Sequence, residues 1–406
     1  MTCPTRRTKN RRNSLDMARG WRPDALLGMG KGLRAGLLAA SALVGGTLVL
    51  VPATRAQDVT FNDTDYAAQG LSGSVFVVNN NLAGNTTVTL TSPVTSSITG
   101  TAIDVANNNA FNSGSISVDV AQVAGGGSGV GILVTQAGSG AVVVGGSNGA
   151  LSDITSGSEA GIRIRQTSTG DSDTVIVSKA GTLTGVNGSG VDIQRVGTGA
   201  AGIMVSGVGD ITGLSLHGLV IENSGNSGAI EVTRQGLIQG VHNGVLIAQS
   251  GSGAVTVGGT GGATGGANAS GVYVQQTGTG PHGAVTVSRA DTLSGGDYGV
   301  LITRSGTGSG AITVSGTGAI TGTNNAGLRI ENNNAANTGA IQITGIGEVT
   351  STGGHGVIAL QTGTGNVTIS SNNLISGQTG GIRATVAGSD ITIDGSGDTT
   401  AATGTA

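Results

Sequence analysis

The sequence predicts an all-β protein, a parallel β-helix (solenoid) of about twelve rungs with a repeat of about 28 residues. The repeat is clearest at Gly299–Ala326, where three short aliphatic bursts are each closed by glycine-rich sequence. The bursts are Val300–Ile302, Ile312–Val314 and Ala319–Gly322. Their apolar residues recur at every second position, which indicates strands with one buried face. Because no helical stretch separates the bursts, three strands per repeat favour a β-helix.

Composition supports a core made of stacked aliphatic residues. Only 2% of the 406 residues are aromatic, so Val and Ile must fill the interior. The 78 glycines suit three corners per rung, where the backbone needs positive φ or close approach. The single cysteine, Cys3, lies near the N-terminus, so we expect no disulfide and no cysteine metal site in the mature chain.

The start of each rung is marked by a small residue followed by an aliphatic one. The spacing between these starts runs from 25 to 30 residues, so the loops vary while the strands keep their pattern. The twelve predicted starts are Ser74, Ala102, Gly131, Gly161, Gly190, Gly218, Gly244, Gly271, Gly299, Gly327, Gly356 and Gly381. Stacking at about 4.8 Å would satisfy the backbone hydrogen bonds that a lone rung leaves open. Three asparagine runs (Asn79–Asn81, Asn107–Asn109 and Asn332–Asn334) fall just after the first strand and are interpreted as structural ladders.

The N-terminal part, 1–56, has the three parts of a signal peptide with an extended basic N-region. Nine basic residues precede an apolar run from Ala35 to Val51, and we place cleavage between Ala56 and Gln57. A membrane anchor is the alternative for the apolar run, and Met17 is an alternative start. The remainder holds 9 Lys/Arg and 20 Asp/Glu, a net charge of −11, which argues against nucleic acid or anionic membrane as partners.

The mature chain divides into two predicted parts. Residues 57–73 carry Phe61 and Tyr66 and are predicted to cap the N-terminal end of the solenoid. Residues 74–406 hold the rungs. The last residues carry no comparable cap, which suggests a fragment or a chain meant to continue.

The basic leader and the cysteine-free strands of the forms G-[VI]-x-[VI] and A-[VI]-T-V resemble the passenger region of bacterial autotransporters. The resemblance covers architecture and composition, and the C-terminal β-barrel of that family is lacking. It implies a right-handed parallel β-helix, exported by the Sec machinery through the leader, secreted or held at the outer surface of a Gram-negative bacterium. The implied role is adhesion, aggregation or a structural stalk. The implied partners are a second copy or a surface glycan or protein.

Serine, histidine and aspartate residues that could act in catalysis occur here in glycine-rich patterns typical of the turns between strands. Gly170-Asp171-Ser172 matches the nucleophile triplet of serine-protease autotransporters, but it lies in a loop without a positioned histidine. Gly354-His355-Gly356 resembles the histidine motif of β-helical polygalacturonases without their aspartate cluster. His217 and His242 form at most half of a metal site. We therefore expect no catalytic, metal or cofactor site.

One outward position of the first strand is apolar in four consecutive rungs: Val220, Leu246, Tyr273 and Leu301. The hypothesis is an interaction stripe for self-association or a ligand. The alternative is that a loop covers these residues or that they merely favour strands. The same position in earlier rungs gives Arg163 and Asp192, a predicted exposed ion pair.

Two alternative functions remain open from the sequence. One is a β-helical polysaccharide-degrading enzyme, which would need acidic residues clustered on adjacent rungs. The other is ice binding, since the second strand presents a row of hydroxyls. That row contains Thr256, Thr286, Thr313, Thr368 and Thr392, with Ser288, Ser315 and Ser370 two positions on, and Glu231 and Gln342 interrupt it.

Overall fold

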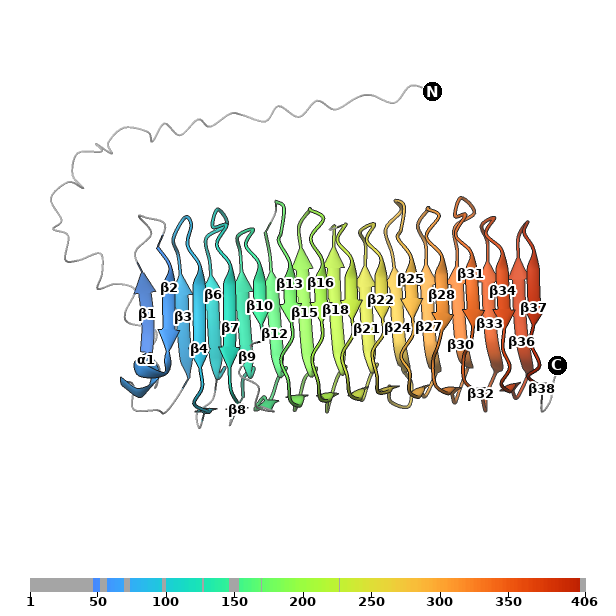
Figure 1. Cartoon of the computed structure of the whole chain (residues 1–406), viewed down its shortest axis with the longest axis horizontal. Coiled ribbons are helices and arrows are strands. Elements are labelled where there is room, and N and C mark those ends of the chain that lie inside the picture. The colour runs from blue at the N-terminus through green and yellow to red at the C-terminus, as the bar shows by residue number, and fades with distance from the viewer. Residues whose placement is uncertain are drawn as a thin grey trace, which may run out of the picture. The chain divides into compact units, whose positions relative to one another are not determined.

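Strands from the three bursts form three parallel sheets, A, B and C, which wind into a solenoid (Figure 1). The computed structural model describes residues 47–51, 57–68, 74–96, 100–125, 128–145, 153–168, 170–225 and 227–401. Along these residues the chain visits A, B and C in turn, and one such circuit is a rung. Rung 1 begins at β3 (Val75–Asn79) and rung 12 at β36 (Gly380–Val386). Within the described ranges, sheets A and B contain 13 strands each and sheet C contains 12.

The strands follow one another along each sheet in chain order. Sheet A contains β1 (Thr47–Val51), β3, β6 (Ile103–Asn107), β9 (Ile132–Gln136), β12 (Ile162–Gln166), β15 (Val191–Val196), β18 (Leu219–Ser224), β21 (Val245–Gln249), β24 (Ser270–Gln276), β27 (Tyr298–Arg304), β30 (Ala326–Asn332), β33 (His355–Gln361) and β36. Sheet B contains β2 (Val59–Asn62), β4 (Thr86–Leu90), β7 (Ile116–Val120), β10 (Val142–Val144), β13 (Val175–Val177), β16 (Ile203–Val205), β19 (Ile230–Val232), β22 (Val255–Val257), β25 (Val285–Val287), β28 (Ile312–Ser315), β31 (Ile341–Thr344), β34 (Val367–Ser370) and β37 (Ile391–Asp394). Sheet C contains β5 (Val94–Ser96), β8 (Val123–Gly125), β11 (Ile154–Thr155), β14 (Leu183–Gly185), β17 (Ile211–Gly213), β20 (Ile238–Gly240), β23 (Ala263–Thr264), β26 (Leu293–Gly295), β29 (Ile320–Gly322), β32 (Val349–Ser351), β35 (Ile375–Gly377) and β38 (Thr399–Ala401).

The predicted repeat is confirmed. Each of the twelve predicted rung starts lies immediately before or inside a strand of sheet A. From rung 8 onward the sheet A strands begin one residue before the predicted start. Ser270 and Tyr298, which precede the predicted starts Gly271 and Gly299, already pair with each other in the sheet. The parallel register stacks equivalent aliphatic residues, for example Val272 on Val300 on Leu328, and all three side chains are fully buried. Each such side chain contributes roughly 1.5–3 kcal/mol through burial, so the columns are the main source of stability.

The stretch predicted as an N-terminal cap contains a strand that the sequence did not predict. Strand β2 pairs in parallel with β4 and extends sheet B by one strand. The only helix in the described residues, α1 (Asp63–Ala68), follows it directly. Phe61 on β2 and Tyr66 on α1 are both buried against the first rung. The two largest aromatic side chains of this stretch therefore cover the aliphatic columns at this end.

Local capping fixes where helix α1 begins. The Asn62 side chain accepts a hydrogen bond from the Thr64 backbone N–H (2.8 Å). The Asp65 carboxylate accepts one from the Asn62 backbone N–H (2.9 Å), so the two residues form a reciprocal capping box. Asp63 accepts hydrogen bonds from the backbone N–H groups of Thr91 and Ser92, which ties the helix to the end of β4.

Strand β1 comes from the apolar run of the predicted signal peptide. It pairs in register with β3, Thr47 beside Val75 and Val51 beside Asn79. The basic N-region and Ala56 lie outside the described residues. Gln57, on the other side of the predicted cleavage point, donates its backbone N–H to the Ala83 carbonyl (3.1 Å). Cleavage at the predicted point would remove β1 and leave β2 and α1 in place.

Candidate functional site

A column of buried polar side chains lines the corner between sheets A and B. Asn79, Asn107 and Asn332 occupy equivalent positions in it. Asn79 Nδ2 donates to Thr86 Oγ1 (3.1 Å). The amides satisfy backbone groups at the corner, as when Gln166 Nε2 donates to the Gly140 carbonyl (3.0 Å). The column is therefore structural. Its members are Asn79, Asn107, Gln136, Gln166, Arg195, Asn223, Gln249, Gln276, Arg304, Asn332 and Gln361.

A second interior column at the corner between sheets B and C consists of cations, and the sequence interpretation missed it. Lys179, Arg234 and Arg289 each stand two residues after a sheet B strand, in rungs 4, 6 and 8. They are 6%, 0% and 0% exposed, respectively. In the rungs between them the same position is glycine, Gly207 and Gly259, both with positive φ. This set of three basic side chains is the cation column.

Each cation reaches back along the solenoid axis to carbonyl groups of earlier rungs. Arg234 donates to the carbonyls of Lys179 and Gly181 two rungs before it, and to those of Ser206 and Gly209 one rung before it. Arg289 repeats the pattern with the carbonyls of Arg234 and Gly236. A Cβ atom at Gly207 would lie 2.8 Å from Arg234 Nη1, so the missing side chain leaves room for that guanidinium. A sequence signal existed, namely Lys or Arg alternating with glycine at one rung position.

The two arginines of the cation column keep their charge at neutral pH. Burial lowers the pKa of Arg234 to about 10 and that of Arg289 to about 10, while Asp210 and Asp291 act in the opposite direction. Both values lie well above 7, so the guanidinium groups stay protonated and donate hydrogen bonds. The bonds to carbonyl groups offset the cost of removing these charges from water.

The predicted interaction stripe is brought together as expected. Val220, Leu246, Tyr273 and Leu301 lie side by side in register on the outer face of sheet A. Val220 is 8% exposed and the other three are partly exposed. Together they form an apolar row on this outer face.

The predicted ion pair between Arg163 and Asp192 is confirmed and is larger than predicted. Arg163 Nε lies 3.1 Å from Asp192 Oδ2, and Arg165 Nη2 lies 2.7 Å from the same oxygen. Arg163 also contacts Glu159. These side chains are partly exposed, so each pair contributes about 1 kcal/mol or less.

The residues weighed for catalysis occupy corner positions that join neighbouring rungs. The Ser172 hydroxyl faces the Val196 carbonyl (3.4 Å), and Asp171 accepts a hydrogen bond from Thr198. The rings of His217 and His242 are tilted by 48° with centroids 5.5 Å apart, and burial together with His242 lowers the pKa of His217. His355 lies at the start of β33, paired with Gly380. Among the described residues, no group of three or more His, Cys, Asp or Glu side chains is placed to hold a metal.

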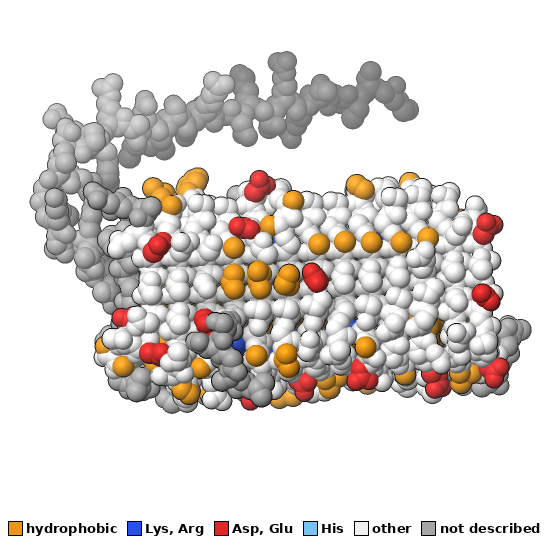
Figure 2. Space-filling model, in the orientation of Figure 1, with side chains coloured by type: hydrophobic (Ala, Val, Ile, Leu, Met, Phe, Trp, Pro, Cys, Tyr) orange, Lys and Arg blue, Asp and Glu red, His pale blue; other side chains and the backbone are white. Residues whose placement is uncertain are grey.

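The hydroxyl row lies on the outer face of sheet B. Thr256, Thr286 and Thr313 are in register, Gln342 follows, and Thr368 and Thr392 resume the row. The face seen in Figure 2 carries few charged side chains, and most of its surface is uncharged. Glu231 precedes Thr256 in the register, so a carboxylate ends the row at rung 6.

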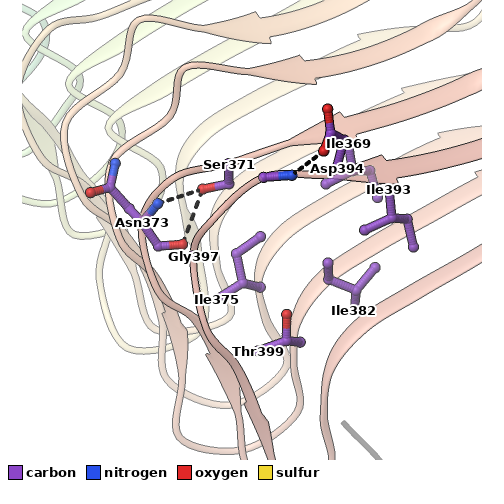
Figure 3. Close-up of a pocket in the computed structure, with 10 residues that line it drawn as sticks. Ile369, Ser371, Asn373, Ile375, Ile382, Ile393, Asp394, Gly397 and Thr399 are labelled. Atoms are coloured by element: carbon purple, nitrogen blue, oxygen red, sulfur yellow. Dashed lines mark hydrogen bonds between the residues drawn. The ribbon is translucent and has the colours of Figure 1, made fainter.

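The surface hollows of the described residues include two that lie away from these rows. One, of about 180 Å³, lies at the last described rungs, where Ile375, Ile382 and Ile393 point into it (Figure 3). Its lining also includes Ser371, Asn373 and Asp394, so apolar and polar side chains share its walls. The other lies at the corner between sheets C and A beside Leu214 and Val241, which are 53% and 56% exposed. The sequence analysis did not single out this apolar corner, because single leucines and valines beside glycine are common at strand ends.

The fold and these surfaces define a parallel β-solenoid protein. Within the described residues, no helix has the length and apolar character needed to cross a membrane. Comparisons with protein-family models, with curated proteins and with solved structures gave no match.

Proposed function

We propose that the chain is an exported, non-catalytic β-helical passenger of an autotransporter-like surface protein, which acts in adhesion or aggregation or as a structural stalk. The observation that carries the proposal is the apolar row on sheet A, which runs unbroken across four rungs of a rigid solenoid. Repeated shallow contacts along a rod suit multivalent binding, since weak contacts add when several engage together. Proposed partners are a second copy or a surface glycan or protein, and the proposed location is the surface of a Gram-negative bacterium.

Export is the first element of this proposal to test. When the full chain is expressed in a Gram-negative host, we expect a processed product that begins at Gln57 and lies outside the cytoplasm. N-terminal sequencing of each cell fraction checks this outcome. A variant with Ala56→Arg, which removes the small residue at the cleavage point, should accumulate unprocessed. An intact chain confined to the cytoplasm would contradict the proposal.

The enzyme alternative has its own readout. Incubation of the processed protein with acidic polysaccharides should leave their viscosity unchanged if the protein is a binding rod. A fall in viscosity would instead favour the polysaccharide-degrading enzyme.

A further inference from the structure

The apolar row on sheet A ends in opposite charges. In register, Asp192 precedes Val220 at rung 5, and Arg329 follows Leu301 at rung 10. The sequence of outward side chains is therefore acidic, four apolar, basic. Asp192 is held by Arg163 and Arg165, and Arg329 is held by Glu331 and by the Tyr298 ring. The side chains of Asp192 and Arg329 remain 17% and 31% exposed.

This order makes the row complementary to itself when it is reversed. A rotation of 180° about an axis along the strands, between Leu246 and Tyr273, places Leu246 of one copy against Tyr273 of the other. The same rotation places Val220 against Leu301 and Asp192 against Arg329. The spacing matches without adjustment, because both copies repeat at the strand spacing of about 4.8 Å. An isologous two-fold contact requires this kind of self-complementarity.

We propose that two copies of the chain associate face to face and antiparallel through the sheet A row. The second copy would be the partner in the proposed aggregation. In this respect the inference rests on the proposed function. Its physical basis is the row itself. A copy is favoured over another partner because residues of opposite charge face each other at both ends of the row while the strand spacing matches.

The size of the surface sets the expected strength. Six rungs by one strand length measure roughly 24 Å by 20 Å, which is smaller than the about 800 Å² per partner of a standard stable interface. A single contact should therefore be weak and dependent on concentration. Many rods displayed on one cell surface would bind through avidity.

The first experiment compares the processed protein with two variants by sedimentation velocity over a concentration series. Leu246→Lys with Leu301→Lys should abolish association, because each buried ammonium would lose its water without gaining a partner. The matched control, Thr264→Lys with Thr321→Lys, places lysines on sheet C of the same two rungs and should associate like the wild type. If the leucine variant melts earlier than the control, Leu246→Asn with Leu301→Asn replaces it. A wild type that stays monomeric, or a leucine variant that associates normally, would overturn the proposal.

The second experiment tests the antiparallel register by charge exchange. Arg329→Asp alone should weaken association, because it faces Asp192 of the other copy. Asp192→Arg alone should weaken it as well, because it faces Arg329. An equal mixture of the two variants should recover association, since every facing pair is then of opposite charge. A mixture that associates no better than either variant alone would rule out the antiparallel register. The export experiment is independent of both, so failure here leaves export unaffected.

Discussion

Replacement of Arg234 by alanine is expected to lower the free energy of unfolding by roughly 3–5 kcal/mol, because several buried carbonyl groups lose their donor and a cavity remains. The carbonyls are those of Lys179, Gly181, Ser206 and Gly209. Arg234→Met should cost less, since methionine fills the space but donates no hydrogen bond. Denaturant unfolding followed by circular dichroism measures both changes.

The control for this prediction is Arg383→Ala, since Arg383 is an exposed arginine on sheet A. Its effect should stay within about 0.5 kcal/mol. Hydrogen exchange should locate the loss in rungs 4 to 6, where the guanidinium acts, because rungs of a solenoid contact mainly their neighbours. Equal stability of the Arg234 and Arg383 variants would show that the cation column contributes nothing.

Substitution of Gly207 is the second change with a large expected effect. Its φ of 95° disfavours any side chain, and a Cβ atom there would lie 2.8 Å from Arg234 Nη1 and 2.8 Å from the Lys179 carbonyl oxygen. We expect Gly207→Ala to destabilise the protein by roughly 2–4 kcal/mol, from backbone strain and from displacement of the guanidinium. Gly388→Ala is the matched control, because a Cβ atom there meets nothing within 4 Å.

A double-mutant cycle separates the two contributions. In the Arg234→Ala background the contact with the guanidinium is gone, so Gly207→Ala should cost less than in the wild type. The backbone strain should remain in both backgrounds. Strictly additive effects would mean that Gly207 and Arg234 do not share the same space.

The aliphatic columns were predictable because each strand repeats an apolar residue at every second position, and a one-residue shift would expose them all. Val300, Ile312 and Ile320 were expected inside for this reason, and the structure buries them. The shared corner position of Asn79 and Asn107 was also predictable, since both follow the first strand of a rung. The sequence did not indicate β2, whose four residues do not belong to a full rung.

The cation column was not predicted because a lysine or arginine in the corner after a strand is ordinarily exposed to solvent. Their inward direction depends on the space left by Gly207 and Gly259, which appears only when rungs are stacked. The proposed interface on sheet A was predictable in part. The four apolar residues could be recognised as a row in the sequence. That Asp192 and Arg329 at its two ends would face each other follows only from the two-fold rotation.

The register of the rungs is the central claim, and an engineered disulfide tests it most directly. Gln275 and Thr303 are paired on the outer face of sheet A. Cysteines at both positions, with Cys3 replaced by serine, should form a disulfide under mild oxidation, because in-register Cα atoms lie about 4.8 Å apart. Cysteines at Gln275 and Leu301 face the same way but are offset by two residues along the strands. Their Cα atoms would lie roughly 8 Å apart, so this pair should not form a disulfide. Cross-linking of the first pair alone would support the stacked 28-residue rungs. Cross-linking of the offset pair, or of neither, would contradict them.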